Sequence, residues 1–167
     1  VILPPDYHNS EINDSKQLSA KQRDKLRQII EKEAIAYSVV SVSEKEIDHI
    51  NILNASIEGM NRAVLQLPVK PQLLLIDGNR FYNHTEIPHH CIVKGDATYL
   101  SIAAASILAK THRDELMQKL DTEYPLYNWK QNKGYPTPEH QRAVIEYGQT
   151  PYHRRSFVLK RWQLKLF

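Results

Sequence analysis

The sequence predicts an α/β fold, and its apolar runs and helical periodicities carry the prediction. Two short apolar runs, 73–76 and 91–93, lead into Asp77 and Asp96. Apolar runs of this length flanked by glycine are typical of buried strands. Segments with the 3.6-residue periodicity of amphipathic helices precede and follow them. Adjacent parallel strands would bring both carboxylates to one edge of a sheet, where α/β proteins bind ligands.

The composition limits the class of protein. The chain has 167 residues, which is the size of one domain, and we assign that domain to 1–167. No apolar run is long enough to cross a bilayer, so we expect no membrane association. The single cysteine, Cys91, excludes an intrachain disulfide and favours a cytoplasmic location. A net charge of +3 permits binding to nucleic acid without requiring it.

One helix and one strand are predicted near the N-terminus. Ser19 and Gln22 have the spacing of a capping box, which predicts a helix over 20–35. The valine-rich segment 36–42 then predicts a short strand.

Two further helices are predicted before the first apolar run. Ser43 and Glu46 repeat the capping-box spacing and predict a short helix that ends at Ile50. A longer amphipathic helix follows from Asn51, and Pro68 ends it.

Three histidines lie between the two apolar runs. We interpret His84, His89 and His90 as loop residues. Zinc is the alternative, but structural zinc sites use tetrahedral sets of cysteine and histidine, and only Cys91 is present.

The second half of the chain alternates helices with an unusual loop. A helix with many small side chains is predicted from Asp96 to about Leu120. The segment 124–138 mixes aromatic rings, lysines and prolines and is predicted to be a loop. Such interleaving suits nucleic acid, because rings stack on sugars or bases while cations meet phosphates. The alternative is a surface loop that packs its own rings. Thr137 then has the position of an N-cap for a helix that ends near Gly148.

The C-terminal part, 138–167, is predicted to be basic and helical. Such charge clusters are usually solvated surface, but they also suit a polyanionic ligand. Six side chains there are basic or can become so: His153, Arg154, Arg155, Lys160, Arg161 and Lys165.

The two strand-end aspartates are candidate metal ligands. Hydrolysis of a phosphodiester by two metal ions needs several carboxylates close together, because Mg²⁺ and Mn²⁺ prefer hard oxygen ligands. For Asp77 the alternative is an Asx-type turn with Gly78. For Asp96 the alternative is the N-cap of the following helix. The pattern by itself leaves both pairs of interpretations open.

Six blocks of sequence together resemble the ribonuclease HII family (type 2 ribonuclease H) of bacterial type. They occur in the family's order and span nearly the whole chain, which makes the resemblance specific. The blocks are Asn13-Asp14-Ser15-Lys16-Gln17-Leu18, Leu75-Ile76-Asp77-Gly78-Asn79, Val93-Lys94-Gly95-Asp96, Ala104-Ala105-Ser106-Ile107-Leu108-Ala109-Lys110, Lys133-Gly134-Tyr135-Pro136-Thr137 and His153-Arg154-Arg155-Ser156-Phe157.

This resemblance implies a fold and an activity. The fold is a ribonuclease H-like mixed sheet flanked by helices, with a helical C-terminal segment. The activity is that of an endonuclease dependent on Mn²⁺ or Mg²⁺ that cuts the RNA strand of RNA–DNA hybrids. It also implies cleavage at ribonucleotides embedded in duplex DNA, leaving 3′-hydroxyl and 5′-phosphate ends. We expect a monomer whose partner is one of these duplexes.

The resemblance also assigns roles to individual residues. Asp77 and Asp96 match two of the family's four catalytic, metal-binding carboxylates. Tyr135 matches the tyrosine that stacks near the sugar at the RNA–DNA junction. Further contacts to nucleic acid are expected from Asn13, Ser15, Lys16, Lys94, Lys133, Arg154 and Arg155.

The sequence departs from the family at its start. Family members open with a strand that carries an Asp-Glu pair, followed by a Gly-Arg-Gly turn, and neither occurs here. The residues 1–3 match the end of the second strand, so the first, central strand is absent from this chain. Loss of that strand would leave buried ladder groups unpaired at about 1–3 kcal/mol each. We therefore expect a longer parent protein and no catalysis by this polypeptide alone.

Two other functions fit parts of the pattern. A non-catalytic nucleic-acid-binding module would keep the basic and aromatic surface and would be indifferent to Mg²⁺ and to Asp77→Asn. A small-molecule phosphatase would use the carboxylates but would have no use for the loop that carries Tyr135.

Overall fold

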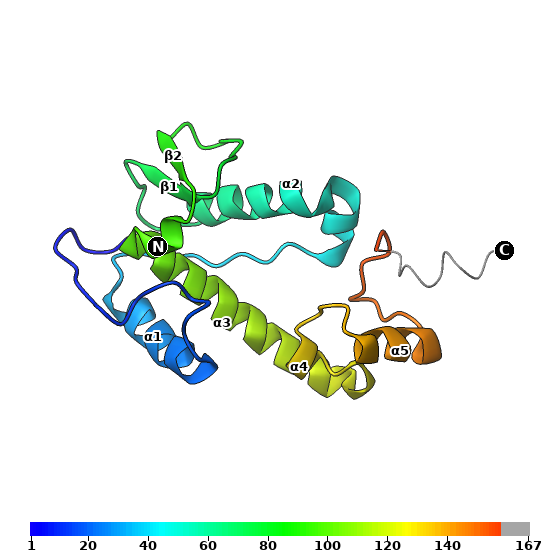
Figure 1. Cartoon of the computed structure of the whole chain (residues 1–167). Helices are drawn as coiled ribbons and strands as arrows, with labels where there is room; N and C mark the ends of the chain where they lie inside the picture. The colour runs from blue at the N-terminus through cyan, green and yellow to red at the C-terminus, as the bar shows by residue number, and fades with distance from the viewer. Residues whose placement is uncertain (158–167) are drawn as a thin grey trace. The chain divides into compact units, whose positions relative to one another are not determined.

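The computed structural model describes residues 1–157 and confirms the α/β class (Figure 1). Contacts between residues divide the chain into two compact units. The first comprises 1–41 and 57–112, and the second comprises 42–56 and the residues from 113 onward. The assignment of 1–167 to one domain stays a prediction. In the described part of the chain, no helix has both the length and the apolar character needed to cross a membrane.

Two parallel strands form the sheet of the first unit. Strand β1 (Leu74–Asp77) pairs with β2 (His89–Ile92), with Leu74 opposite His89 and Asp77 opposite Ile92. Leu74 and Ile76 point into a small core, while Asp77 is exposed at the strand end. Both predicted strands are confirmed, although β2 begins earlier than the apolar run.

The prediction that the histidines are loop residues is wrong for His89 and His90. The parallel pairing with β1 extends to both of them, because the backbone of Leu74 and Leu75 provides partners whatever the side chains are. His84 does lie in the loop.

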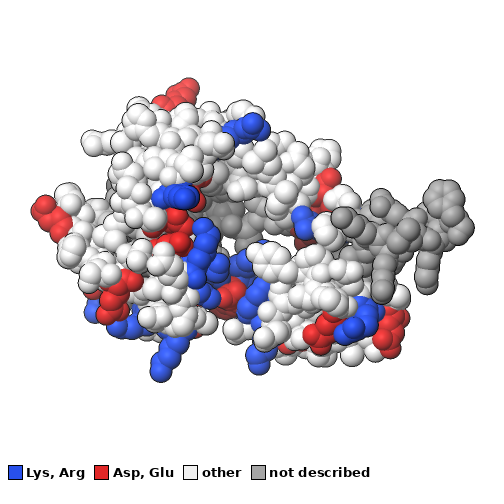
Figure 2. Space-filling view, in the orientation of Figure 1, with Lys and Arg blue, Asp and Glu red and all other residues white. Residues whose placement is uncertain are grey.

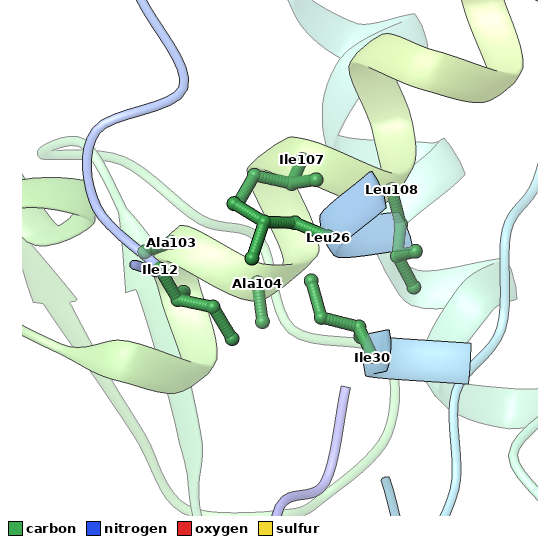
Figure 3. Packing of buried hydrophobic residues seen from close by; sticks show 7 residues of the cluster. All are labelled: Ile12, Leu26, Ile30, Ala103, Ala104, Ile107 and Leu108. Carbon is green, nitrogen blue, oxygen red and sulfur yellow. The ribbon is translucent and has the colours of Figure 1, made fainter. Parts of the chain in front are cut away.

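The main core of the first unit lies between α1 (Ala20–Glu33) and α3 (Leu100–Glu123). The predicted capping box is present, with the Ser19 hydroxyl accepting from the Gln22 amide. Figure 3 shows the apolar side chains of α1 meeting the small and branched side chains of α3. The alanines on α3 carry little bulk, so the two helices approach closely. The cluster comprises Ile12, Leu26, Ile30, Ala103, Ala104, Ile107 and Leu108.

The strand predicted over 36–42 is wrong. Among the described residues, only Ala36 in this segment pairs with another backbone, in an isolated antiparallel bridge to Ile2. A strand needs a continuous ladder of hydrogen bonds, and the valines of 39–42 meet no such partner in the described chain.

The two predicted helices after Ser43 are confirmed as one interrupted element, α2 (Glu44–Leu65). Ser43 and Glu46 form the expected reciprocal capping bonds. Asn51 has φ 67° and ψ 165°, which breaks the helix. Its side-chain Oδ1 accepts from the Leu53 and Asn54 amides and so caps the second segment.

Up to residue 157, the second unit contains three helical segments after α3. These are η2 (Pro125–Tyr127), α4 (Trp129–Asn132) and α5 (Pro138–Tyr147). The N-cap at Thr137 and the end at Gly148 are as predicted. The prediction of one loop over 124–138 is wrong, because η2 and α4 lie within this segment. Tyr127 in η2 and Trp129 in α4 are buried in the core of the unit.

Within 138–157, the described part of the segment 138–167, the helical prediction holds only for α5. Residues 148–157 form turns and irregular backbone, starting at Gly148, whose φ of 82° ends the helix. Lys160, Arg161 and Lys165 lie outside the described residues.

Candidate active site

The two predicted carboxylates lie at the same edge of the β1–β2 sheet. Asp77 ends β1, and Asp96 lies in η1 (Gly95–Ala97), four residues beyond the end of β2. The Gly95 amide donates to Asp77 Oδ1 at 2.9 Å, which joins the two elements directly. Asp77 is exposed, whereas Asp96 is only 6% exposed. The sheet edge therefore brings together one open and one buried acid.

Neither alternative interpretation of these aspartates is realised. Asp77 Oδ1 bonds to an amide 18 residues away instead of closing a local Asx turn with Gly78. Lys94 occupies the N-cap of η1, in the left-handed conformation, and α3 begins only at Leu100. Both carboxylates are thus available for another role.

Lys16 brings a positive charge to these acids. Its ammonium nitrogen lies 3.3 Å from Asp96 Oδ2, and its side chain is 71% exposed. The hydrogen bond with Asp96 raises the pKa of Lys16, and the charges of Asp96, Asp14 and Asp77 raise it further. Asp14, which the sequence reasoning did not single out, accepts from the Lys16 amide, and that bond lowers the pKa of Asp14. Asp14 belongs to the same family block as Lys16, and this position in the sequence could have marked it as a site residue.

The loop that carries Lys16 is anchored by its neighbours. The Ser15 hydroxyl pairs with the Ser106 hydroxyl at 2.8 Å, and Ser15 is only 2% exposed. Arg23 donates to the carbonyls of Ser15 and Leu18. The Ser15 hydroxyl is therefore buried and already bonded, and the expected contact of Ser15 with nucleic acid stays a prediction. Asn13 is exposed and accepts from the Asp14 amide.

The acids at the sheet edge fit a divalent cation. Carboxylate oxygens are the ligands that Mg²⁺ and Mn²⁺ prefer, and this edge already favours the ammonium of Lys16. No group of three or more potential ligands comes together within residues 1–157. Asp77 and Asp96 would therefore supply two of the ligands that such an ion needs.

The second unit presents Tyr135 on a structured turn. Buried Asn132 donates to the Tyr127 carbonyl at 2.7 Å and accepts from the Gly134 amide at 2.9 Å. Its amide thereby fixes the turn that carries Tyr135, which is 67% exposed. The predicted role of Tyr135 requires this exposure. In contrast, Tyr127 and Trp129 stack at 5.4 Å inside the core, as the ring-packing alternative expected.

The basic residues that are predicted to contact nucleic acid differ in their solvent exposure. The Lys133 side chain is only 26% exposed, and its nitrogen lies 3.7 Å from Asp114 Oδ1. Lys94 and Arg155 are exposed. Arg154 is partly buried, with its guanidinium 5.1 Å from the centre of the Phe157 ring. On the face shown in Figure 2, basic and acidic side chains gather in small interspersed groups.

Paired acids at the carboxyl edge of a parallel sheet define this protein as a candidate metal-dependent hydrolase with an α/β fold. Comparison with known proteins gives the family. A model of the family described as ribonuclease HII matches residues 1–165. The chain belongs to the ribonuclease HII family, whose members are metal-dependent endoribonucleases with ribonuclease H activity on nucleic acid.

Individual relatives agree with this assignment. The chain is 61% identical to ribonuclease HII of Bacteroides thetaiotaomicron over 159 residues, covering 95% of this chain and 80% of the relative. It is 60% identical to ribonuclease HII of Parabacteroides distasonis, covering 99% and 83%. The crystal structure of ribonuclease H2 from Pyrococcus horikoshii OT3 superposes with a TM-score of 0.76 at 29% identity, covering 90% of this chain and 79% of that one.

Proposed function

We propose that this protein hydrolyses the RNA strand of RNA–DNA hybrids and cuts at ribonucleotides embedded in duplex DNA. The observation that carries the proposal is the meeting of Asp77 and Asp96 at one sheet edge, joined through the Gly95 amide. A phosphodiester is anionic, so its approach to two carboxylates requires cations between them. Mg²⁺ or Mn²⁺ would meet that need at this edge.

The chemistry is the addition of water to phosphorus with cleavage of the bond between phosphorus and the 3′ oxygen. The 3′ oxygen takes up a proton and becomes a hydroxyl, and the oxygen of water stays on the 5′-phosphate. Divalent ions, when bound, lower the pKa of water and neutralise the charge that develops on the leaving oxygen. Asp77 and Asp96 would hold these ions, and Lys16 provides a further cation for a nearby phosphate.

Exposed Tyr135 is the proposed recognition group for the sugar at the junction. A ring that stacks on a sugar or base must be held at a fixed angle, and the Asn132 hydrogen bonds hold the turn beneath it. Lys94, Arg154 and Arg155 are the proposed contacts to the phosphates.

The test compares the cleavage activity of the Asp77→Asn and Asp96→Asn variants with that of the natural protein. The substrate is a labelled DNA duplex with one ribonucleotide, incubated with Mn²⁺, with Mg²⁺ or with chelator. We expect cleavage by the unmodified protein with either metal, none by the two variants, and hybrid binding largely unchanged.

Asp24→Asn is the matched control, because Asp24 is an exposed aspartate on α1 of the same unit. This variant should cleave normally. Metal-independent cleavage, or full activity of Asp77→Asn, would contradict the proposed mechanism.

A further inference from the structure

Asp48 on α2 binds a segment that is far away in the sequence. Its carboxylate accepts from the Arg155 amide at 2.6 Å and from the Ser156 amide at 3.1 Å. The Ser156 hydroxyl donates to the same carboxylate. Figure 1 shows the segment after α5 running beside the first turns of α2. The Asp48 carboxylate thereby accepts three hydrogen bonds from the segment 154–156.

Further contacts hold the two ends of the same segment. On the N-terminal side, His153 Nδ1 accepts from the Thr150 amide at 3.0 Å, and the His153 ring stacks on His140. On the C-terminal side, the Arg154 guanidinium lies over the Phe157 ring. Hydrogen bonds thus hold the backbone before the two arginines and at Arg155 and Ser156, and a side-chain contact joins Arg154 to Phe157.

We propose that Asp48 is a positioning residue for nucleic-acid binding, which acts by fixing the backbone that presents Arg154 and Arg155 to phosphates. This inference rests on the proposed function, because it needs the two arginines to meet a phosphate backbone. Without the Asp48 bonds, the amides of 155 and 156 return to solvent and the arginines sample many positions. Each arginine must then lose conformational entropy when it binds a phosphate. In the unmodified protein, much of that entropy is already lost on folding.

The sign of the effect separates positioning from plain electrostatics. Asp48 is an acid beside two arginines, so removing its charge should strengthen attraction to a polyanion if charge alone matters. Positioning predicts weaker binding instead. Loss of one phosphate contact lowers the salt dependence of log K by about 0.9, which corresponds to about eightfold weaker binding at 0.1 M salt relative to 1 M.

The experiment measures binding of an RNA–DNA hybrid by fluorescence anisotropy, with chelator present so that no cleavage occurs, over a series of salt concentrations. The proteins are the unmodified chain, Asp48→Ala, Asp48→Asn, Ser156→Ala and the double variant Arg154→Ala/Arg155→Ala. Glu44→Gln is the control, because it removes the same charge one turn earlier on α2. Thermal unfolding followed by circular dichroism accompanies each measurement.

We expect Asp48→Ala to weaken binding by about eightfold or more at 0.1 M salt and to reduce the slope by about 1, which is the loss of one phosphate contact. The double arginine variant removes both contacts and should reduce the slope by about 1.8. Asp48→Asn and Ser156→Ala keep part of the hydrogen bonding and should weaken binding less. Glu44→Gln should bind as well as the unmodified chain or better.

Three outcomes would overturn the inference. Asp48→Ala could bind as tightly as Glu44→Gln, or could lower the melting temperature with an unchanged salt slope, which would show a structural role only. The double arginine variant could also bind normally. Failure of the unmodified chain to bind the hybrid would refute the proposed function itself, and the inference with it. If Asp48→Ala fails to fold, Ser156→Ala decides, because it changes no charge and removes a single hydroxyl.

Discussion

Gly95→Ala combined with Ile102→Val tests the packing that joins the two carboxylates. A Cβ added to Gly95 would lie 2.6 Å from Ile102 Cδ1, which is far inside contact distance. It would also lie 3.5 Å from Asp77 Oδ1 and from Ile92 Cβ. The φ of Gly95 is not positive, so the effect is steric and does not involve backbone strain.

The magnitude follows from the burial of the colliding atom. Ile102 belongs to the buried core, so its side chain cannot move without disturbing neighbours. Inserting a methyl group into such packing costs about 1–3 kcal/mol in the free energy of unfolding. For a chain of this size, each kcal/mol lowers the melting temperature by roughly 2–4 °C.

Ile102→Val removes the colliding Cδ1 and should rescue Gly95→Ala. The valine alone costs about 0.5–1.5 kcal/mol, and the double variant should be more stable than the sum of the single effects by more than about 0.5 kcal/mol. Urea unfolding of the four proteins measures this coupling. Gly78→Ala is the control: nothing lies within 4 Å of its Cβ position, but its φ of 110° strains an alanine, so Ile102→Val should not rescue it. Additive effects of Gly95→Ala and Ile102→Val would refute the proposed contact.

Two further predictions concern the stability of each unit. Ser19→Ala removes the capping box of α1 and should lower the free energy of unfolding by about 0.5–2 kcal/mol in urea. In the second unit, burial and, to a smaller extent, the charge of His140 together lower the pKa of His153 to about 4. The unfolded chain takes up a proton near pH 6.5 and the folded chain only near 4, so stability should fall as the pH drops through this window. His153→Asn, whose Oδ1 can still accept from the Thr150 amide, should flatten this dependence.

Clear results would contradict both predictions. Equal stability of Ser19→Ala and the control Lys21→Ala, an exposed position in the first turn of α1, would show that the cap contributes nothing. An unfolding free energy of the unmodified chain that is constant between pH 6.5 and 4 would contradict the burial of neutral His153.

The sequence by itself determined the features that depend on neighbours in the chain. The helix starts at Ser19, Ser43 and Thr137 were predictable because each cap bonds to an amide three residues away. The carboxylates at the ends of β1 and β2 were predictable as a pair, because parallel strands share a carboxyl edge.

Only the tertiary structure decided what depends on distant partners. Ser15 looked like a surface contact, but it bonds to a hydroxyl 91 residues away and is buried. The valines after Ala36 have strand propensity, yet a strand forms only where a second backbone supplies its hydrogen bonds. No local spacing marks Asp48, and only the fold places the Arg155 amide, 107 residues away, on its carboxylate. Local hydrogen bonds can be read from spacing, whereas these partners are chosen by the packing of the whole unit.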